Sequence, residues 1–437
     1  MPHQIQNFLE NYQLIPPTPN LFGDHLPQAK KSPAKKSFLH YSSEKTPNFE
    51  NEFWTAKQRK SSSLHEISYR ACFKAELPNF FIKLLTKEGD AVYDPFAGRG
   101  TVAIESALLN RQIISNDINP LSRIFTEARL EIPSIAELSE RLSEIKISKK
   151  ITAEIDLSMF FEKETLSEIL SLKNYLQARK ELGEEDHVDR WIRMVATNRL
   201  TGHSSGFFSV YTMPPNQAVS ARKQVELNQK NNRQPEYRDV KAIILKKSRS
   251  LLRGLSQAQK ENLKNAGKSA IFLNKSASST SEISDNSLAL IVTSPPFLDV
   301  IDYAADNWLR CWFNGINLEE MRQKISTHKK LVEWNKFIAE CFAEFHRIVK
   351  PQGYVAFEVG EVRGGKIKLE EEVLPIGLNA GFNCIAIIIN SQKFTKTSNI
   401  WGVANNQKGT NSNRVLLFQK TKKRKANSNS NFKILCE

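Results

Sequence analysis

A glycine-containing turn, DPFAGRGT at residues 94–101, follows a short apolar run and precedes a helical one. The apolar run at residues 90–93 (DAVY) is typical of a buried strand, and residues 102–109 have the pattern of a helix. Residues 112–115 (QIIS) then have the pattern of a second strand. A strand that returns through a helix lies parallel to its neighbour. The turn therefore favours an α/β arrangement with parallel strands.

The same alternation resumes in the second half of the chain. Residues 331–349 carry apolar side chains at helical spacing between two strand-like runs. We therefore predict an α/β fold with a doubly wound, mainly parallel sheet and a large, mostly helical insertion. The strand-like runs of this half are residues 270–273, 288–292, 354–358, 384–389 and 414–418.

Composition sets the predicted boundaries of the parts. The first 60 residues are rich in Pro, Lys, Ser and Asn and have no sustained apolar period, which is typical of a partly disordered arm. Residues 160–182 are an example of the helical patterns that break the alternation. The predicted parts are an N-terminal arm (1–60), the first half of an α/β domain (61–125), a helical insertion (126–267), the second half of the domain (268–420) and a basic tail (421–437).

Positive charge dominates the chain, with 62 Lys and Arg residues against 47 Asp and Glu residues. Between residues 214 and 265 there are twelve basic and four acidic residues. Such an excess favours a polyanionic partner, because phosphates neutralised by Lys or Arg release counterions. Basic segments that only keep the protein in solution are the alternative, and charge alone does not separate the two.

Neither a membrane span nor a metal site is expected. The longest apolar runs, such as residues 385–389, are far shorter than the ~20 residues of a membrane helix. The five cysteines stand alone, without the spacing of a zinc site or of a disulfide framework. We therefore expect a cytoplasmic protein with reduced thiols and no metal.

The turn at residues 94–101 also has the features of a ligand site. Gly98 and Gly100 allow the backbone to bend sharply and to approach a ligand closely. Asp117 ends the second strand, where a carboxylate accepts hydrogen bonds from both hydroxyls of a ribose. Tight turns and helix caps use the same residue types. Together, at this spacing, the three residues favour a cofactor that contains a nucleoside.

A double proline follows the apolar run at residues 288–292, in the sequence TSPPF. Pro295 and Pro296 have no N–H, so the local carbonyls face no competing donors. A carbonyl and the Ser294 hydroxyl would accept both protons of an exocyclic amino group, and Phe297 offers a flat face for an extruded base. A stiff exit from the strand is the alternative interpretation of the same residues.

The sequences DPFAGRGT, DINP and TSPPF resemble, in this order, the motifs of the DNA amino-methyltransferases, which have the class I methyltransferase fold. The resemblance implies transfer of a methyl group from S-adenosylmethionine to N4 of cytosine or N6 of adenine. TSPPF is most similar to the cytosine-N4 enzymes. Residues 65–85 are similar to the segment that closes over the methionine end of the cofactor. Arg99 departs from the Ser that is commoner at its position.

Roles and partners follow from the same resemblance. The motif order is similar to the family's alpha arrangement, which implies that the insertion (126–267) recognises the target. Duplex DNA is then the partner, together with a cognate restriction endonuclease, and the protein is expected at the nucleoid. The residues implied are Asp94, Phe96, Gly98, Gly100 and Asp117 for the cofactor, and Ser294, Pro295, Pro296 and Phe297 for the flipped base.

Phosphate contacts are predicted from the basic residues of the insertion. Solvated helix faces are the alternative for each of them taken singly. His203, in the turn LTGHSSGFF, either reads a base edge or is an ordinary turn residue. The candidate DNA-binding residues are Arg222, Lys223, Arg233, Lys246, Lys247 and Arg249.

Three rival functions stay open. Enzymes that methylate adenine N6 in DNA, or an amino group in RNA, share the glycine turn but more often carry Asp or Asn at the position of Ser294. A catalytically silent DNA-binding subunit would keep the fold, although the intact motif residues argue against it. Methylation at cytosine C5 uses a Pro-Cys nucleophile, and this chain has no Pro-Cys dipeptide.

Overall fold

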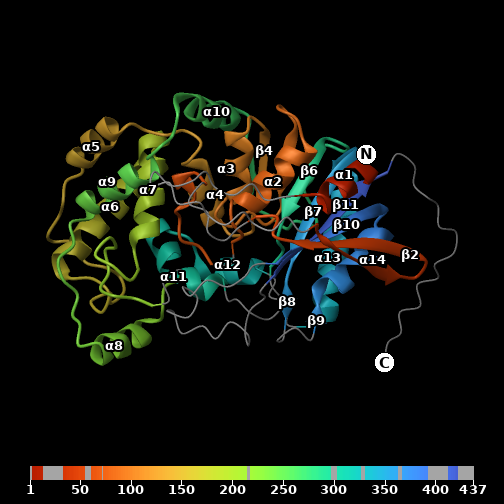
Figure 1. The fold of residues 1–437 in the computed structure, drawn as a ribbon. Coiled ribbons are helices and arrows are strands. Elements are labelled where there is room, and N and C mark those ends of the chain that lie inside the picture. Colours follow the sequence, from red (N-terminus) through yellow and green to blue (C-terminus); the bar gives the residue numbers. More distant parts are fainter. Residues whose placement is uncertain are drawn as a thin grey trace, which may run out of the picture. The chain divides into compact units, whose positions relative to one another are not determined.

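Parallel strands flank the glycine turn in the computed structural model. Strand β3 (Ala91–Asp94) pairs in parallel with β4 (Gln112–Asn116), which pairs in parallel with β5 (Ile271–Leu273). Helix α3 (Thr101–Leu108) joins β3 to β4 (Figure 1). The α/β class predicted from the sequence is confirmed. The structure describes residues 2–12, 33–54, 61–70, 72–213, 217–296, 303–325, 330–362, 367–391 and 412–421.

The chain forms two compact units, and neither is continuous in sequence. The first consists of Met1–Trp54, Ser281–Ile291 and Asn335–Glu437. The second consists of Thr55–Thr280 and Val292–Trp334. The boundaries therefore differ from those predicted by composition.

The second unit holds the glycine turn and most of the helices. Its strands follow the order β6-β3-β4-β5, where only the last two residues of β6 (Leu288–Thr293) belong to this unit. Its helices are α2 (Glu76–Leu85), α3, α4 (Leu121–Glu127), α5 (Ile135–Glu144), α6 (Lys163–Glu181), α7 (His187–Arg199), α8 (Ala221–Lys230), α9 (Val240–Leu251), α10 (Gln257–Lys268), α11 (Tyr303–Asn314) and α12 (Leu318–Lys324), with a 3₁₀ turn at Ser63–His65.

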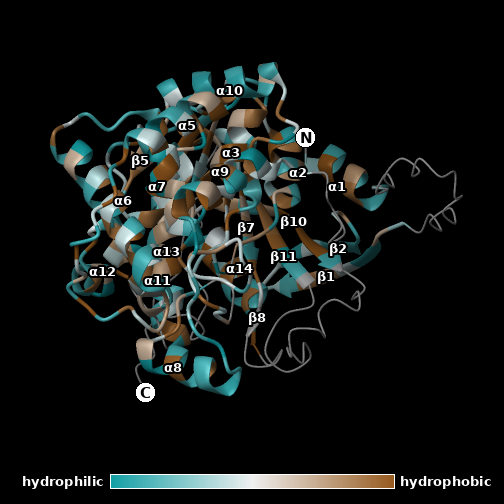
Figure 2. Ribbon diagram, turned by 90° about the vertical axis from the view of Figure 1, so that its left-hand side faces the viewer, coloured by the Kyte–Doolittle hydropathy of each residue, from teal (hydrophilic) through white to brown (hydrophobic). Residues whose placement is uncertain are grey.

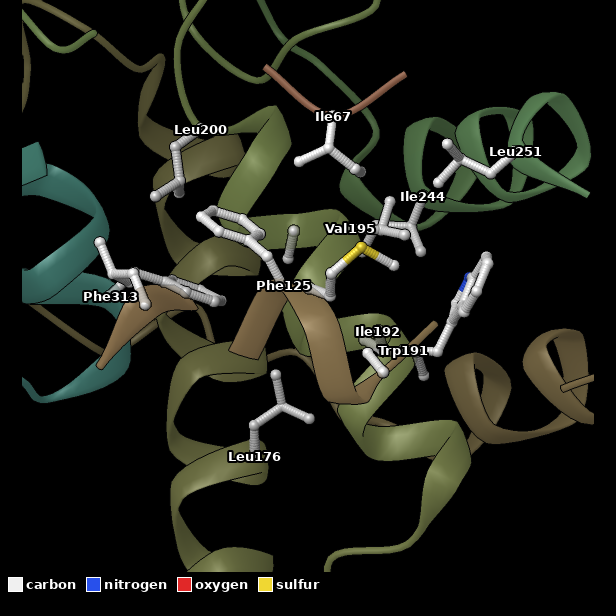
Figure 3. Packing of buried hydrophobic residues seen from close by; sticks show 14 of the residues in the cluster. Ile67, Phe125, Leu176, Trp191, Ile192, Val195, Leu200, Ile244, Leu251 and Phe313 are labelled. Carbon is white, nitrogen blue, oxygen red and sulfur yellow. The ribbon is translucent and has the colours of Figure 1, made fainter. Parts of the chain in front are cut away.

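One apolar core runs through this second unit. Phe125 of α4, Trp191 and Val195 of α7, and Ile244 of α9 are fully buried in one cluster (Figure 3). The helices of the predicted insertion thus share their core with the glycine-turn segment. The predicted boundary at residue 126 does not separate two compact bodies, because both sides bury their apolar residues against each other.

Surface helices of the second unit bury few residues. Helix α8 buries only Gln224, and α10 buries Leu263 and Ala266. Figure 2 shows long hydrophilic stretches of ribbon along both helices. These helices pack through a narrow stripe and present the rest of their surface to solvent.

The first unit contains the strand order β1-β2-β10-β11-β7-β6, with the first four residues of β6, and a separate pair β8-β9. Strand β11 pairs antiparallel with both β10 and β7, whereas β2 pairs in parallel with β10. The elements not yet named are α1 (Pro2–Glu10), β1 (Lys35–Tyr41), β2 (Glu44–Asn51), α13 (Leu331–Ile348, whose first turn belongs to the second unit), β7 (Val349–Val359), β8 (Glu361–Val362), β9 (Ile367–Lys368), α14 (Leu369–Asn379), β10 (Phe382–Ser391) and β11 (Ser412–Lys420).

Residues 35–54 do not form an arm. Strands β1 and β2 form a hairpin, and β2 adds to the edge of β10. Next to it, the Phe53 and Trp54 N–H groups both donate to Oδ1 of Asn390, at 2.8 and 3.1 Å. The prediction of an arm is therefore wrong for residues 35–54, because backbone pairing with a distant strand holds this polar segment in place. The basic run of the predicted tail, residues 422–425, lies outside the described residues.

Within the described ranges, no helix is both long and apolar enough to cross a membrane. The same ranges contain no group of three or more His, Cys, Asp or Glu residues arranged to hold a metal ion.

Candidate active site

The glycine turn is a tightly packed left-handed bend. Gly98 has φ +53° and Gly100 has φ +76°, values that favour glycine over residues with a Cβ. A Cβ atom at Gly100 would lie 2.1 Å from Oγ1 of Thr126. At Gly98 it would lie 3.3 Å from Sγ of Cys72. The backbone therefore favours glycine at both positions, and the neighbouring Thr126 adds a steric demand at Gly100.

Asp117 lies beside this turn, as its position at the end of β4 predicts. The Gly98 N–H donates to Oδ2 of Asp117 at 2.7 Å, and the Asn119 N–H donates to Oδ1 at 2.8 Å. Burial raises the pKa of this carboxyl to about 6, against the two backbone donors that lower it. The group is therefore mainly ionised at neutral pH.

The donor and acceptor chemistry of Asp117 fits a nucleoside cofactor. Each carboxylate oxygen accepts one backbone N–H and keeps a further lone pair. Two ribose hydroxyls are donors that suit such a pair of oxygens. The half-buried position of Asp117 leaves part of the side chain accessible. The residues present therefore fit the expected cofactor.

Asp94 connects the glycine turn to the TSPPF segment. Its Oδ1 accepts a 2.7 Å hydrogen bond from the Thr293 hydroxyl and a 3.1 Å hydrogen bond from the Phe96 N–H. Asp94 and Thr293 are both fully buried. Burial raises the pKa of Asp94 to about 7, although both hydrogen bonds lower it. The tips of β3 and β6 are thus joined by side chains.

The residues after Thr293 form the exit from β6. Ser294 and Pro296 are half-buried and Pro295 is buried. The Trp334 indole N–H donates to the Pro296 carbonyl at 3.0 Å, which fixes the direction of the chain. Among the described residues, no donor lies on the Pro295 carbonyl. Phe297, predicted to stack on the base, lies outside the described residues.

The carboxyl ends of β6, β3 and β4 lie next to one another in the second unit. Ser294, Asp94 and Asp117 are located at these three ends. Ligands of open α/β sheets bind outside the carboxyl ends of the strands. The structure therefore brings the predicted cofactor residues together with the first residues of the TSPPF exit, while their roles stay predictions.

Arg99 is a structural residue of the site that sequence reasoning did not identify. Its guanidinium donates to the carbonyls of His65 and Phe73 at 3.2 Å and of Ile67 at 3.1 Å. Arg129 adds a 3.0 Å bond to the Leu64 carbonyl. Two guanidinium groups therefore hold the 64–73 segment against the glycine turn. In the sequence, Arg99 stood out only because Ser is commoner at this position of the motif.

Tyr69 is a second residue that was missed. Its hydroxyl accepts a 3.1 Å hydrogen bond from the side chain of Asn119, two residues after Asp117. Its ring packs edge-on against Phe125, with the centroids 5.8 Å apart. Tyr69 also lies within 3.7 Å of the position that a Cβ at Gly98 would take. The aromatic ring in the sequence HEISYRACF thus borders the turn.

The six predicted DNA-binding residues differ in their freedom to bind. Arg222 and Arg233 are exposed, as are Lys223, Lys246 and Arg249. Arg222 forms an ion pair with Glu226 at 3.2 Å, of the weak kind found on helix surfaces. Lys247 is half-buried and pairs with Glu66 at 3.2 Å, so its charge is partly balanced inside the protein.

Comparisons with known proteins match this chain to methyltransferases. Residues 17–124 match a family model described as DNA methylase, of the N6/N4 methyltransferase type. The type II methyltransferase M.BsoBI of Geobacillus stearothermophilus is 22% identical over 361 residues, which are 74% of this chain and 69% of that protein.

Solved structures similar to this chain include a SAM-dependent methyltransferase of Methanosarcina mazei, at 11% identity and a TM-score of 0.30. That match covers 78% of this chain and 97% of the other. TrmN of Thermus thermophilus matches at 12% identity and a TM-score of 0.30, over 80% of this chain and 50% of the other.

Proposed function

We propose that this chain, an amino-methyltransferase whose cofactor is S-adenosylmethionine, methylates N4 of cytosine at a specific site in duplex DNA. The DNA substrate is extended to this chain from the DNA methylase model that residues 17–124 match. The type II relative favours a restriction-modification system, in which a cognate endonuclease acts on the same site.

The hydrogen bond between Thr293 and Asp94 is the observation that carries the proposal. It holds the start of the TSPPF exit at the tip of the strand that leads into the glycine turn. A methyl donor held at the turn and a base held at Ser294 would therefore be close neighbours. Positioning of two reactants in this way supplies much of the acceleration in group transfer.

Asp117 and the glycine turn would hold the cofactor in this scheme. Asp117 accepts the ribose hydroxyls, and the backbone of Gly98 allows the close approach of the ligand. When bound, S-adenosylmethionine supplies an electrophilic methyl group on a positively charged sulfur. Tyr69 and the 64–73 segment border the same turn and would restrict the access of water.

Ser294 and the Pro295 carbonyl would activate the amino group of the base. The lone pair of cytosine N4 is delocalised into the ring, which makes this nitrogen a poor nucleophile. Two acceptors that hold both amino protons draw the nitrogen towards tetrahedral geometry and localise the lone pair. The indole of Trp334 fixes the Pro296 carbonyl and so leaves the preceding carbonyl for the base.

The proton of the amino group needs only a weak acceptor. Once the nitrogen carries the new methyl group, its remaining protons are far more acidic than in cytosine. The Ser294 hydroxyl or a water molecule then receives one of them. The base must leave the duplex to reach Ser294, at a cost of a few kcal/mol of unstacking.

Ser294 favours cytosine N4 over the other amino-methylation targets. Enzymes that act on adenine N6 more often carry Asp or Asn at this position. A serine hydroxyl is a neutral and smaller acceptor than those side chains. Adenine-N6 methylation of DNA is the second candidate, because the glycine turn and Asp117 serve either base equally.

Methylation of unmodified genomic DNA by the purified protein tests this function. DNA and, in a parallel reaction, RNA are incubated with S-adenosylmethionine carrying a labelled methyl group and digested to nucleosides, which are identified by mass spectrometry. We expect label in N4-methylcytosine. Label in N6-methyladenine would overturn the choice of base, and label in RNA alone would overturn the choice of substrate.

A further inference from the structure

A loop in the second unit, residues 200–212, has a short exposed polar tip, and most of its other residues are buried. His203, Ser204 and Ser205 at its tip are exposed. On either side of the tip, Thr201 and Phe207 are 7% and 5% exposed. A polar surface on an otherwise buried and ordered loop is the usual form of a binding element, because the rigid base lowers the entropy lost on binding.

Hydrogen bonds hold the two ends of this loop in place. The Thr212 N–H donates to the Gly202 carbonyl at 2.9 Å, which closes the loop. The Thr212 hydroxyl donates to the side chain of Gln224 at 3.1 Å, and the Val210 N–H donates to the Phe160 carbonyl at 2.9 Å. A Cβ at Gly202 would lie 2.4 Å from the Phe207 ring, so the two residues are in close contact.

The residues before the loop are tied to α11, the helix that follows the TSPPF segment. The Asn198 side chain donates to the Ser68 carbonyl at 3.0 Å, and Arg310 of α11 donates to the same carbonyl at 3.0 Å. One carbonyl of the 64–73 segment therefore joins the end of α7 to α11.

The residues after the loop are tied to the same helix. The Ala218 N–H donates to the Asp306 carbonyl at 3.0 Å, and the Trp308 indole donates to the Val219 carbonyl at 3.1 Å. Arg70 bridges the side chains of Gln217 and Asp306, at 2.9 and 2.6 Å. The loop thus has a fixed position relative to the helix that begins just after the base-binding residues.

Positive charge accumulates beneath the tip. The guanidinium of Arg199 lies 3.9 Å from the centre of the Phe207 ring, and the side chain is 9% exposed. Burial and the nearby Arg310 lower the pKa of Arg199 to about 10, so it stays charged at neutral pH. The nearby carboxylates are Glu66 for Arg199 and Asp306 for Arg310, and among the described residues neither lies within ion-pair distance of its cation.

A second cation packs against an aromatic ring of the same loop. Arg233, which is exposed, lies 4.8 Å from the centre of the Tyr211 ring on the loop itself. Cations that lie close to aromatic rings and form no direct ion pair are stabilised further by an external anion. Hydroxyl, imidazole and guanidinium groups are also those that contact phosphates and base edges in DNA complexes.

We propose that the 200–212 loop contacts duplex DNA beside the target base and contributes to the choice of the methylated sequence. In this assignment, which rests on the proposed function, a phosphodiester lies near the charge of Arg199 and Arg233. His203, Ser204 and Ser205 contact the adjacent base edges or phosphates.

Binding of sheared genomic DNA from a host without DNA methylation tests the loop. The triple variant His203→Ala/Ser204→Ala/Ser205→Ala changes only exposed tip residues, and it is compared with Gln257→Ala/Lys260→Ala/Glu261→Ala on the exposed face of α10. We expect the tip variant to bind DNA about tenfold more weakly than the α10 control, with equal affinity for S-adenosylmethionine and equal melting temperature. Equal DNA affinity of the two variants would overturn the proposal.

Sequence choice is measured by mapping the methylated positions in DNA treated with each variant. We expect the tip variant to accept sites that the α10 control rejects, and an unchanged map would remove the loop from sequence recognition. Arg233→Ala should reduce the slope of log affinity against log salt by about 0.9, and an unchanged slope would exclude a phosphate contact there.

The binding assay separates this proposal from the proposed function. The binding assay contains no methyl donor, so its result does not depend on catalysis. If the wild-type protein binds DNA but transfers no methyl group in the labelling assay, the proposed function is overturned. The DNA affinities of the two variants still decide the role of the loop. A wild-type protein that binds no duplex DNA would overturn both.

Discussion

Thr293 and Asp94 lie 199 residues apart in the chain, and the Thr293 hydroxyl donates a 2.7 Å hydrogen bond to Oδ1 of Asp94. The same oxygen accepts the Phe96 N–H, so one buried carboxyl orients both the glycine turn and the end of β6. This arrangement gives Thr293 a positioning role for Ser294, the residue that follows it.

Thr293→Val should lower kcat by about tenfold, with little change in the affinity for S-adenosylmethionine or in the KM for DNA. Valine keeps the size and the β-branch of threonine but removes the donor to Asp94. The first residue of the catalytic exit then loses its fixed direction. Steady-state kinetics with labelled cofactor, together with cofactor titration by calorimetry, measure the three quantities.

Thr293→Ser is the matched control, because it keeps the hydroxyl and loses only a methyl group. It should recover most of the turnover. If the valine and serine variants are impaired equally, packing of the methyl group matters and the hydrogen bond does not.

Ser294→Ala should lower kcat by an order of magnitude or more and leave cofactor affinity nearly intact. The variant removes one of the two acceptors proposed for the amino protons without touching Asp117 or the glycine turn. Ser279→Ala, at an exposed serine elsewhere in the second unit, serves as the control. Turnover of Ser294→Ala equal to that of the control would exclude Ser294 from the chemistry.

Asp94→Asn should become increasingly more stable than the wild type as the pH rises from 5 to 8. Burial raises the pKa of Asp94 from 3.8 to about 7, so the folded protein binds this proton more tightly than the unfolded chain. The stability that this group contributes therefore falls as the pH rises through that window. Asparagine cannot ionise but still accepts the Thr293 hydroxyl. Melting temperatures of both proteins across the pH range measure the difference, and a constant difference would contradict the expectation.

Arg99→Ser should release the 64–73 segment from the glycine turn. The variant loses three hydrogen bonds from a charged donor to carbonyls, at a cost of about 2 kcal/mol or more of stability. Faster amide hydrogen exchange in residues 64–70 and weaker cofactor binding should follow.

Arg123→Ser is the control for Arg99→Ser, because its ion pair with Glu127 lies on the surface of α4. Such pairs contribute about 0–1 kcal/mol. Hydrogen exchange of residues 64–70 that is the same in both variants would show that Arg99 does not restrain the segment.

Local patterns explain which parts of the fold the sequence predicts. The strand and helix around the glycine turn were expected at residues 90–93 and 102–109 and are observed at Ala91–Asp94 and Thr101–Leu108. Apolar periodicity is a property of short segments, so it can be read without the fold.

The N-terminal hairpin shows what such patterns miss. Strand β1 (KKSFLHY) is almost wholly exposed, so it lacks the alternation of apolar and polar residues that marks a half-buried strand. The hairpin of β1 and β2 joins the sheet through the pairing of β2 with β10, which lies more than 300 residues away in the chain. A segment of this kind has no local signal.

The site was predicted to a similar extent. Gly98, Gly100 and Asp117 could be singled out because their spacing has a geometric meaning, and the structure places them together while their roles stay predictions. Arg99 and Tyr69 were not, because their partners are backbone carbonyls and side chains on other segments. Counting charges also did not reveal that Lys247 pairs with Glu66.

Gly100 has a further implication for variants and relatives that have lost methyl transfer. Its φ of +76° and the side chain of Thr126, with which a Cβ at Gly100 would clash, disfavour any side chain at this position, whether or not a cofactor binds. A silent descendant of this protein would therefore retain the glycine in order to fold. Ser294 is half-buried at a strand tip and is under no comparable steric demand. In a relative that has lost methyl transfer, we therefore expect Ser294 to be substituted before Gly100.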